Sequence, residues 1–121
     1  MKTAEIAKQL VELCRKGENA VAKEKFYSPD IVSIEATDTP AGPRETRGLT
    51  AVKKKGEWWE SAHTVNKASV DGPFVALDKF SAVFEYDVTI KATGKRMQMK
   101  EVAVYTVSDG KIVLEEFLYG M

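Results

Sequence analysis

Glu101 is the side chain in this sequence that is best suited to acid–base chemistry. It lies in the apolar-rich segment 97–107, where strand alternation places it on the same face as Met99, Ala103 and Tyr105. A carboxylate that faces an apolar interior must accept hydrogen bonds, take up a proton or line a wet pocket, because a buried lone charge is too costly. Burial would raise its pKa toward neutrality, which suits a general base that removes a proton next to a carbonyl. The alternative is a structural carboxylate bonded to a tyrosine, the histidine or an indole N–H.

Three further polar side chains are candidates for the same site. His63, the only histidine, follows Trp59 by four residues at the end of an expected helix and so shares its face. A catalytic role competes there with that of a satisfied helix-terminal residue. Glu35 ends a short expected strand beside a long loop, and Tyr119 could donate a phenolic hydrogen bond to a ligand oxygen. We therefore expect Glu101, His63 and Glu35 as candidate catalytic residues and Tyr119 as a candidate ligand contact.

Aromatic side chains supply the expected wall of the pocket. Trp59, Phe80, Phe84 and Tyr86 share the phase of the inward-facing positions on their helix and strand. Such a stripe is mainly core, but part of it would line a cavity for a small apolar molecule. One histidine and one cysteine are too few for a typical zinc or iron site, and no glycine-rich phosphate loop follows a strand, so no metal and no cofactor are expected.

Composition limits the classes of protein to which the chain can belong. With 121 residues, of which 44% are hydrophobic and 30% charged, it suits one globular domain over residues 1–121. Lys plus Arg and Asp plus Glu both number 18, so no overall charge attracts nucleic acid. No apolar stretch is long enough for a membrane helix. The lone Cys14 favours a buried thiol and a reducing cytoplasm. The basic run 53–55 suits a solvated helix face, with anion binding as the alternative.

Periodicity predicts three helices and then a sheet. Helical spacing occurs over residues 3–16, 18–25 and 50–62, and a short strand over 31–36 precedes a long loop at 37–47. Strands are expected over 65–70, 74–90, 97–107 and 112–119, joined by turns at 71–73, 93–94 and 108–110. The 17-residue strand 74–90 has one apolar and one polar face, so it must bend and curve the sheet. Val102 and Val104 on the opposite face from Glu101 predict a homodimer through the sheet.

The chain resembles the nuclear transport factor 2-like superfamily, specifically its SnoaL-like (polyketide cyclase-like) branch. The resemblance is carried by the opening helices, the segment 26–35, the Arg47-Gly48 entry to the Trp-bearing helix and the ending 105–113. It implies an α+β fold: a cone-shaped curved antiparallel sheet wrapped around N-terminal helices, with a deep pocket and commonly a homodimer.

The resemblance does not carry over one mechanism. The ketosteroid isomerase branch uses a tyrosine and two aspartates, and the matching positions here hold Leu10, Ala36 and Ala103. Glu35 and Glu101 lie close in sequence to the vacated acid positions. We therefore expect a small-molecule pocket protein, as a cofactor-free isomerase, cyclase or dehydratase acting by carboxylate proton transfer on an apolar carbonyl or hydroxyl compound. The alternative is a non-catalytic ligand-binding or protein-interaction module.

Overall fold

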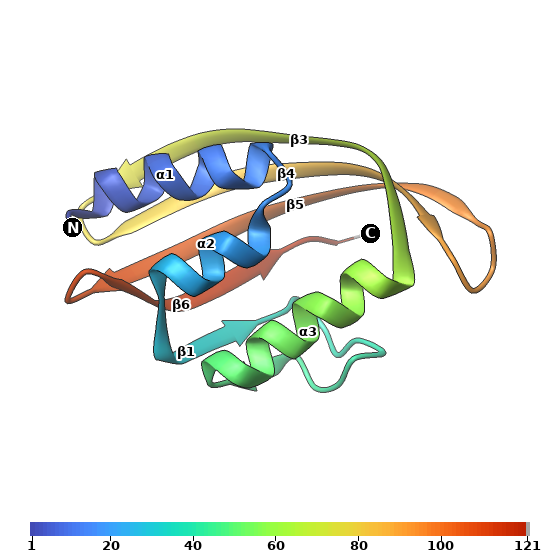
Figure 1. The fold of residues 1–121 in the computed structure, drawn as a ribbon, viewed down its shortest axis with the longest axis horizontal. Helices are drawn as coiled ribbons and strands as arrows, with labels where there is room; N and C mark the ends of the chain where they lie inside the picture. Colours follow the sequence, from blue (N-terminus) through green and yellow to red (C-terminus); the bar gives the residue numbers. More distant parts are fainter. Residues whose placement is uncertain (121) are drawn as a thin grey trace.

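The computed structural model describes residues 1–120, which form three helices packed on one face of a curved six-stranded sheet (Figure 1). The final residue of the expected domain, Met121, lies outside the described residues. The helices are α1 (Thr3–Arg15), α2 (Asn19–Phe26) and α3 (Leu49–Ala62). The strands are β1 (Tyr27–Ile34), β2 (Glu45–Arg47), β3 (His63–Ala76), β4 (Lys79–Ile90), β5 (Arg96–Ser108) and β6 (Lys111–Leu118).

The sheet has the strand order β2-β1-β6-β5-β4-β3 and is open at both edges. Neighbouring strands are antiparallel except β1 and β6, which pair in parallel. The sheet is therefore mixed, and a parallel neighbour is feasible because most of the chain lies between these two strands. In Figure 1, α1 runs along β3 and β4, whereas α3 lies beside β1, toward the opposite edge of the sheet. This arrangement confirms the expected α+β cone.

The core lies between the helices and the concave face of the sheet. On α1, the residues Ile6, Leu10 and Val11 recur at helical spacing and are at most 1% exposed. Burying a large aliphatic or aromatic side chain contributes about 1.5 to 3 kcal/mol, so this layer dominates the stability of the fold. The other fully or nearly fully buried hydrophobic residues include Phe26, Ile31, Val52, Phe80, Ala82, Val88, Ala103 and Ile112.

The expected turn at residues 71–73 is wrong, and so is the single strand 74–90. β3 continues through this region to Ala76, and the chain reverses at Leu77 and Asp78 before β4 begins. The Asp-Gly-Pro sequence instead accompanies a register shift between Asp71 and Phe74, where an irregularity accommodates glycine and proline inside a strand. Phe74 consequently lies on the outer face and is 55% exposed.

Other expected boundaries shift less. β1 begins at Tyr27, earlier than residue 31, because Pro29 falls within a register shift where its missing N–H is tolerated. The expected loop 37–47 contains the short strand β2 at its end. The turns at 93–94 and 108–110 are confirmed, and in the latter both Asp109 (φ 50°) and Gly110 (φ 75°) adopt the left-handed conformation of a tight hairpin. Among the described residues, no helix has the length and apolar character required to cross a membrane.

Candidate functional site

Glu101 lies on the concave face of the sheet, as alternation along its strand predicts. Its Cα partner in β4 is Phe84, which is 3% exposed, and the strand neighbour Ala103 on the same face is fully buried. Burial is the main cause that raises the pKa of Glu101 to about 7, and the negative charges of Glu35 and Glu115 add to it, whereas Lys55 opposes the shift. No side-chain hydrogen bond to Glu101 forms within residues 1–120. Its carboxyl group is thus half-buried and free to exchange a proton near neutral pH.

Near Glu101, Lys55 of α3 forms an ion pair with Glu35, which directly follows β1. Lys55 Nζ donates to Glu35 Oε2 at 2.9 Å and to Ser33 Oγ at 2.5 Å. The Tyr119 hydroxyl donates to Glu35 Oε1 at 3.2 Å. The side chains of Lys55 and Glu35 are only 17% and 14% exposed. The expectation that the whole run 53–55 is a solvated helix face is therefore wrong for Lys55, which faces inward.

The position of Lys55 follows from the start and the phase of α3. Gly48 (φ 90°) adopts a backbone conformation that suits glycine, and its carbonyl accepts the first helical hydrogen bond from Val52 N. Val52 is fully buried, and Lys55 and Trp59 follow it by three and seven residues on the same face. That spacing was the available sequence signal for Lys55. It was missed because lysine is rarely placed inside.

An aromatic chain runs from the end of α3 onto the sheet. The rings of Trp59 and His63 stack with centroids 4.5 Å apart, Trp59 lies 5.3 Å from Tyr86, and Tyr86 stacks on Phe84 at 6.1 Å. His63 Nδ1 lies 2.8 Å from the Trp59 carbonyl oxygen. The structure therefore brings Trp59, His63, Tyr86 and Phe84 together, with Phe84 as the strand partner of Glu101.

Phe80 does not join this chain. Its ring stacks on Tyr105 at 4.7 Å, and both residues are at most 3% exposed. Phe80 therefore lies in the core, beside the tyrosine, instead of beside Trp59 and His63.

A second carboxyl group on the same concave face, Glu115, was not singled out from the sequence. It is 2% exposed, accepts a short hydrogen bond from the Tyr27 hydroxyl, and is the Cα partner of Tyr105. Burial first, and then the nearby Glu115, raise the pKa values of both tyrosines well above their usual range. The phenol of Tyr27 therefore stays protonated and remains a donor. The signal that was available is period two along β6, which aligns Glu115 with Phe117.

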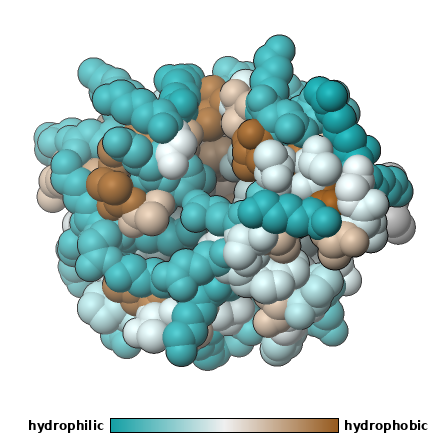
Figure 2. Space-filling model, turned by 45° about the vertical axis from the view of Figure 1, so that its right-hand side comes forward, coloured by the Kyte–Doolittle hydropathy of each residue, from teal (hydrophilic) through white to brown (hydrophobic). Residues whose placement is uncertain are grey.

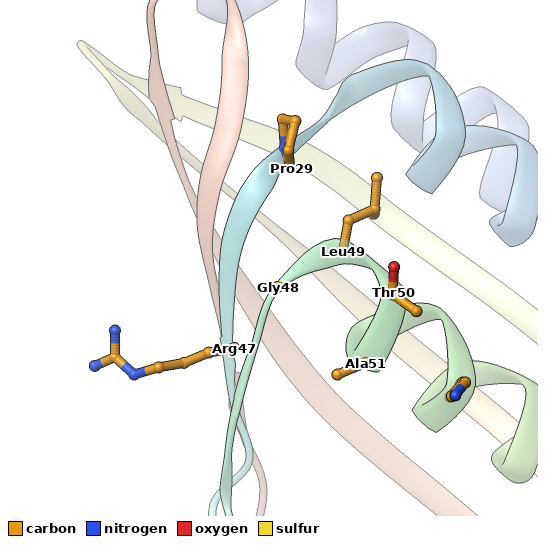
Figure 3. A pocket seen from close by; sticks show the side chains of 7 residues that line it. Pro29, Arg47, Gly48, Leu49, Thr50 and Ala51 are labelled. Atoms are coloured by element: carbon orange, nitrogen blue, oxygen red, sulfur yellow. The ribbon is translucent and has the colours of Figure 1, made fainter.

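Two open depressions lie along α3. One, of about 470 Å³, lies between the start of β1 and the start of α3, and in Figure 3 the Arg47 side chain extends away from the other labelled residues. The second, of about 490 Å³, lies between residues 39–46 and α3, and its lining includes Lys55 and Trp58. In Figure 2, hydrophobic residues on the visible face form small groups separated by hydrophilic side chains. Neither depression contains Glu101 or His63 among its lining residues.

Glu35 and Glu101 differ in how readily they can accept a proton. Glu35 already accepts from both Lys55 and Tyr119, so its carboxylate is engaged, whereas Glu101 has neither partner. Of the two candidate bases, Glu101 is thus the one that can accept a proton without first breaking an ion pair. Within the described part of the chain, no group of three or more His, Cys, Asp or Glu side chains is arranged to hold a metal ion.

Comparisons with solved structures place this geometry in a known fold. A candidate SnoaL-like polyketide cyclase from Mesorhizobium loti is 46% identical, with 98% of this chain and 100% of that chain covered and a TM-score of 0.93. An NTF2-like protein from Burkholderia thailandensis is 20% identical, with 98% and 91% covered and a TM-score of 0.81. A candidate isomerase from Bacillus subtilis is 14% identical, with 95% and 84% covered and a TM-score of 0.74.

The remaining comparisons address the sequence itself. No protein of curated function matches it. The family model of the SnoaL-like domain matches residues 1–119, which is nearly the whole chain. The resemblance inferred from the sequence motifs is thereby confirmed: the chain belongs to the SnoaL-like domain family.

Proposed function

We propose that this protein binds a small, largely apolar carbonyl or hydroxyl compound beside Glu101 and catalyses a cofactor-free proton transfer on it, as an isomerase, cyclase or dehydratase. The observation that carries the proposal is the state of Glu101: a half-buried carboxyl group without a hydrogen-bond donor, whose pKa burial raises to about 7. A base with a pKa near ambient pH is present in its ionised form and still takes up a proton readily. The candidate cyclase and the candidate isomerase among the solved relatives are compatible with such chemistry.

The aromatic chain supplies the apolar part of the proposed binding site. Phe84 flanks Glu101 on the neighbouring strand, and Tyr86, Trp59 and His63 continue from it in ring contact. Ring faces of this kind bind apolar compounds through area burial and fix their orientation. A ligand placed against them would present its polar end to Glu101 and the adjacent Lys55–Glu35 pair.

The test is the exchange of C–H protons next to a carbonyl for deuterium, followed by NMR across a panel of enolisable ketones. Glu101→Gln keeps the shape of the side chain but cannot accept the proton, so exchange should fall roughly 100-fold or more while the protein remains folded. Glu85→Gln, on the same sheet but paired with Lys100 at the surface, is the matched control and should retain exchange. Full exchange in the Glu101 variant would refute the proton-transfer role.

The alternative function is a non-catalytic ligand-binding or protein-interaction module, and the homodimer is a separate proposal. The outer face of the sheet carries Val83, Val102 and Leu118 as consecutive Cα partners across β4, β5 and β6, and Leu118 is 55% exposed. Such an apolar row favours an interface, and we propose a homodimer through it. Sedimentation at micromolar concentration should give twice the chain mass, and Val102→Glu should halve it. A monomeric wild-type protein would contradict the dimer.

The cellular setting proposed for this function is the cytoplasm. Cys14 is the single cysteine in the sequence, and it is a half-buried free thiol. Burial is the main cause that raises the pKa of this thiol to about 11, so it is an unreactive packing residue that requires no oxidising compartment.

A further inference from the structure

We propose that Lys55 is a second catalytic residue, whose ammonium group binds the carbonyl oxygen of the substrate and stabilises the enolate that forms when Glu101 takes the adjacent proton. This inference rests on the proposed function and assigns the group that stabilises the negative charge on the substrate oxygen. The C–H bond breaks toward Glu101, its electron pair forms the C=C bond, and the carbonyl π pair moves onto the oxygen that Lys55 binds. Return of the proton from Glu101 to a carbon atom of the enolate restores the carboxylate and completes the cycle.

Counting donors shows that Lys55 has an N–H to spare. An ammonium group has three N–H donors, of which one goes to Ser33 Oγ and one to Glu35 Oε2. The third has no acceptor within residues 1–120. A substrate oxygen can therefore bind Nζ without displacing either existing partner.

The other donors nearby are already occupied. The single hydroxyl proton of Tyr119 is donated to Glu35, and burial together with the charge of Glu35 raises the pKa of this phenol to about 12. His63 directs Nδ1 at the Trp59 carbonyl oxygen, at the far end of the aromatic chain from Phe84. Lys55 is consequently better placed for the substrate oxygen than either donor that the sequence suggested.

The surroundings of Lys55 hold its flexible side chain in one position. Ser33 is fully buried and Glu35 is anchored by Tyr119, so both acceptors are themselves fixed. Nζ also lies 5.4 Å from the centre of the Phe117 ring, whose strand partner is Ala103, two residues from Glu101. A cation fixed in advance beside the base stabilises developing negative charge without reorganising during the reaction.

The charge of Glu35 completes the arrangement. It neutralises Lys55 in the resting site, so no uncompensated cation is buried, and it also disfavours ionisation of Glu101. When an enolate forms, Lys55 bridges two anions, Glu35 and the substrate oxygen. The site therefore selects ligands whose oxygen becomes negative during reaction, which is the class of enolisable ketones and aldehydes.

The experiment uses a nitrophenolate as a stable mimic of the enolate and nitrobenzene as its neutral counterpart. Binding is measured by absorbance and by NMR at about pH 6, with a nitrophenol that is ionised there. We expect Lys55→Met to weaken nitrophenolate binding roughly 10-fold or more and to change nitrobenzene binding less than about twofold. Lys54→Met, which removes the adjacent exposed lysine of α3, is the matched control and should bind both probes like the wild type.

A measurement on the unmodified protein covers the case in which the Lys55 variant does not fold. A cation at the oxygen should lower the pKa of the bound nitrophenol below its value in water, which a spectrophotometric titration detects. Equal nitrophenolate binding by wild type and Lys55→Met, no saturable binding by the wild type, or a bound pKa that is unchanged or raised would each overturn the proposal.

The two proposals fail in different ways. Glu101→Gln should lose C–H exchange while it still binds the nitrophenolate, because it keeps the ammonium group and loses only the base. Retained exchange in that variant would refute the role of Glu101 and leave the anion site intact. If Glu101→Gln loses exchange but Lys55→Met binds the nitrophenolate as tightly as the wild type, the role of Lys55 is refuted and that of Glu101 stands.

Discussion

Two carboxyl groups on the same concave face, Glu101 on β5 and Glu115 on β6, have opposite surroundings. Glu115 is 2% exposed, accepts from the Tyr27 hydroxyl and is packed beside Tyr105. Glu101 is half-buried and has no donor within the described chain, and burial raises its pKa to about 7. The comparison teaches that the donors around a buried acid, more than its burial, decide whether it stabilises the fold or remains available for chemistry.

The first prediction, with the largest effect on stability, concerns the buried member of this comparison. Tyr27→Phe removes the hydroxyl donor and leaves the Glu115 carboxyl buried without it. The free energy of unfolding should fall by about 3 kcal/mol, because an unsatisfied buried polar group loses the full compensation for its desolvation. Urea denaturation measures this change. Proton exchange per folded molecule should remain near the wild-type value. A loss of exchange as large as that of Glu101→Gln would contradict a purely structural role for the Tyr27–Glu115 pair.

The second prediction uses pH to observe Glu101. Because its pKa is raised from 4.5 to about 7, the folded protein binds more protons than the unfolded chain between these values. The stability that Glu101 contributes is therefore fully present below about pH 4.5 and is lost as pH rises through 7. Discounted for partial exposure, the loss should be about 2 kcal/mol. Glu101→Gln should lack this component in unfolding curves at a series of pH values. Identical pH dependence in the two proteins would contradict the raised pKa.

The third prediction concerns the two hydrogen bonds that hold Glu35 beside Glu101. Tyr119→Phe removes the hydrogen bond to Glu35 Oε1 but leaves Lys55 bound to Oε2. Because one contact persists and water reaches the site, unfolding free energy should fall by about 1 kcal/mol or less. Exchange should decrease less than about fivefold. Calorimetry and the deuterium-exchange assay give both values, and a stability loss as large as that of Tyr27→Phe would remove the contrast between the two regions.

The smallest effect is expected where a charge pair belongs to neither region. Lys100 Nζ lies 3.4 Å from Glu85 Oε1 on the surface of the sheet, and both side chains are more than half exposed. Lys100→Ala should change the free energy of unfolding by less than about 0.5 kcal/mol, because solvent and salt screen such pairs. Proton exchange should be unchanged. A larger loss would contradict the solvent exposure of this pair.

Strand alternation and helical spacing were sufficient to predict the direction of a side chain where a single strand or helix determines it. Glu101 faces inward because period two along β5 places it with Met99 and Ala103, and Trp59 meets His63 because they are four residues apart. The hairpin at Asp109 and Gly110 was also predictable, since few residues other than these tolerate its backbone conformation. The turn between β3 and β4 was not, because its reversal at Leu77 lacks a glycine signal while the Asp-Gly-Pro sequence lies within a strand.

The sequence by itself determined the alternating faces, the helices and the presence of an inward acid on β5. Only the tertiary structure decided which acid is free, because that depends on partners brought from distant segments: Lys55 and Tyr119 to Glu35, and Tyr27 to Glu115. Lys55 illustrates the reason. A lysine on an amphipathic helix is solvated unless a strand opposite the helix offers acceptors, and Ser33 and Glu35 on β1 and just beyond it become such acceptors only when α3 packs against that strand.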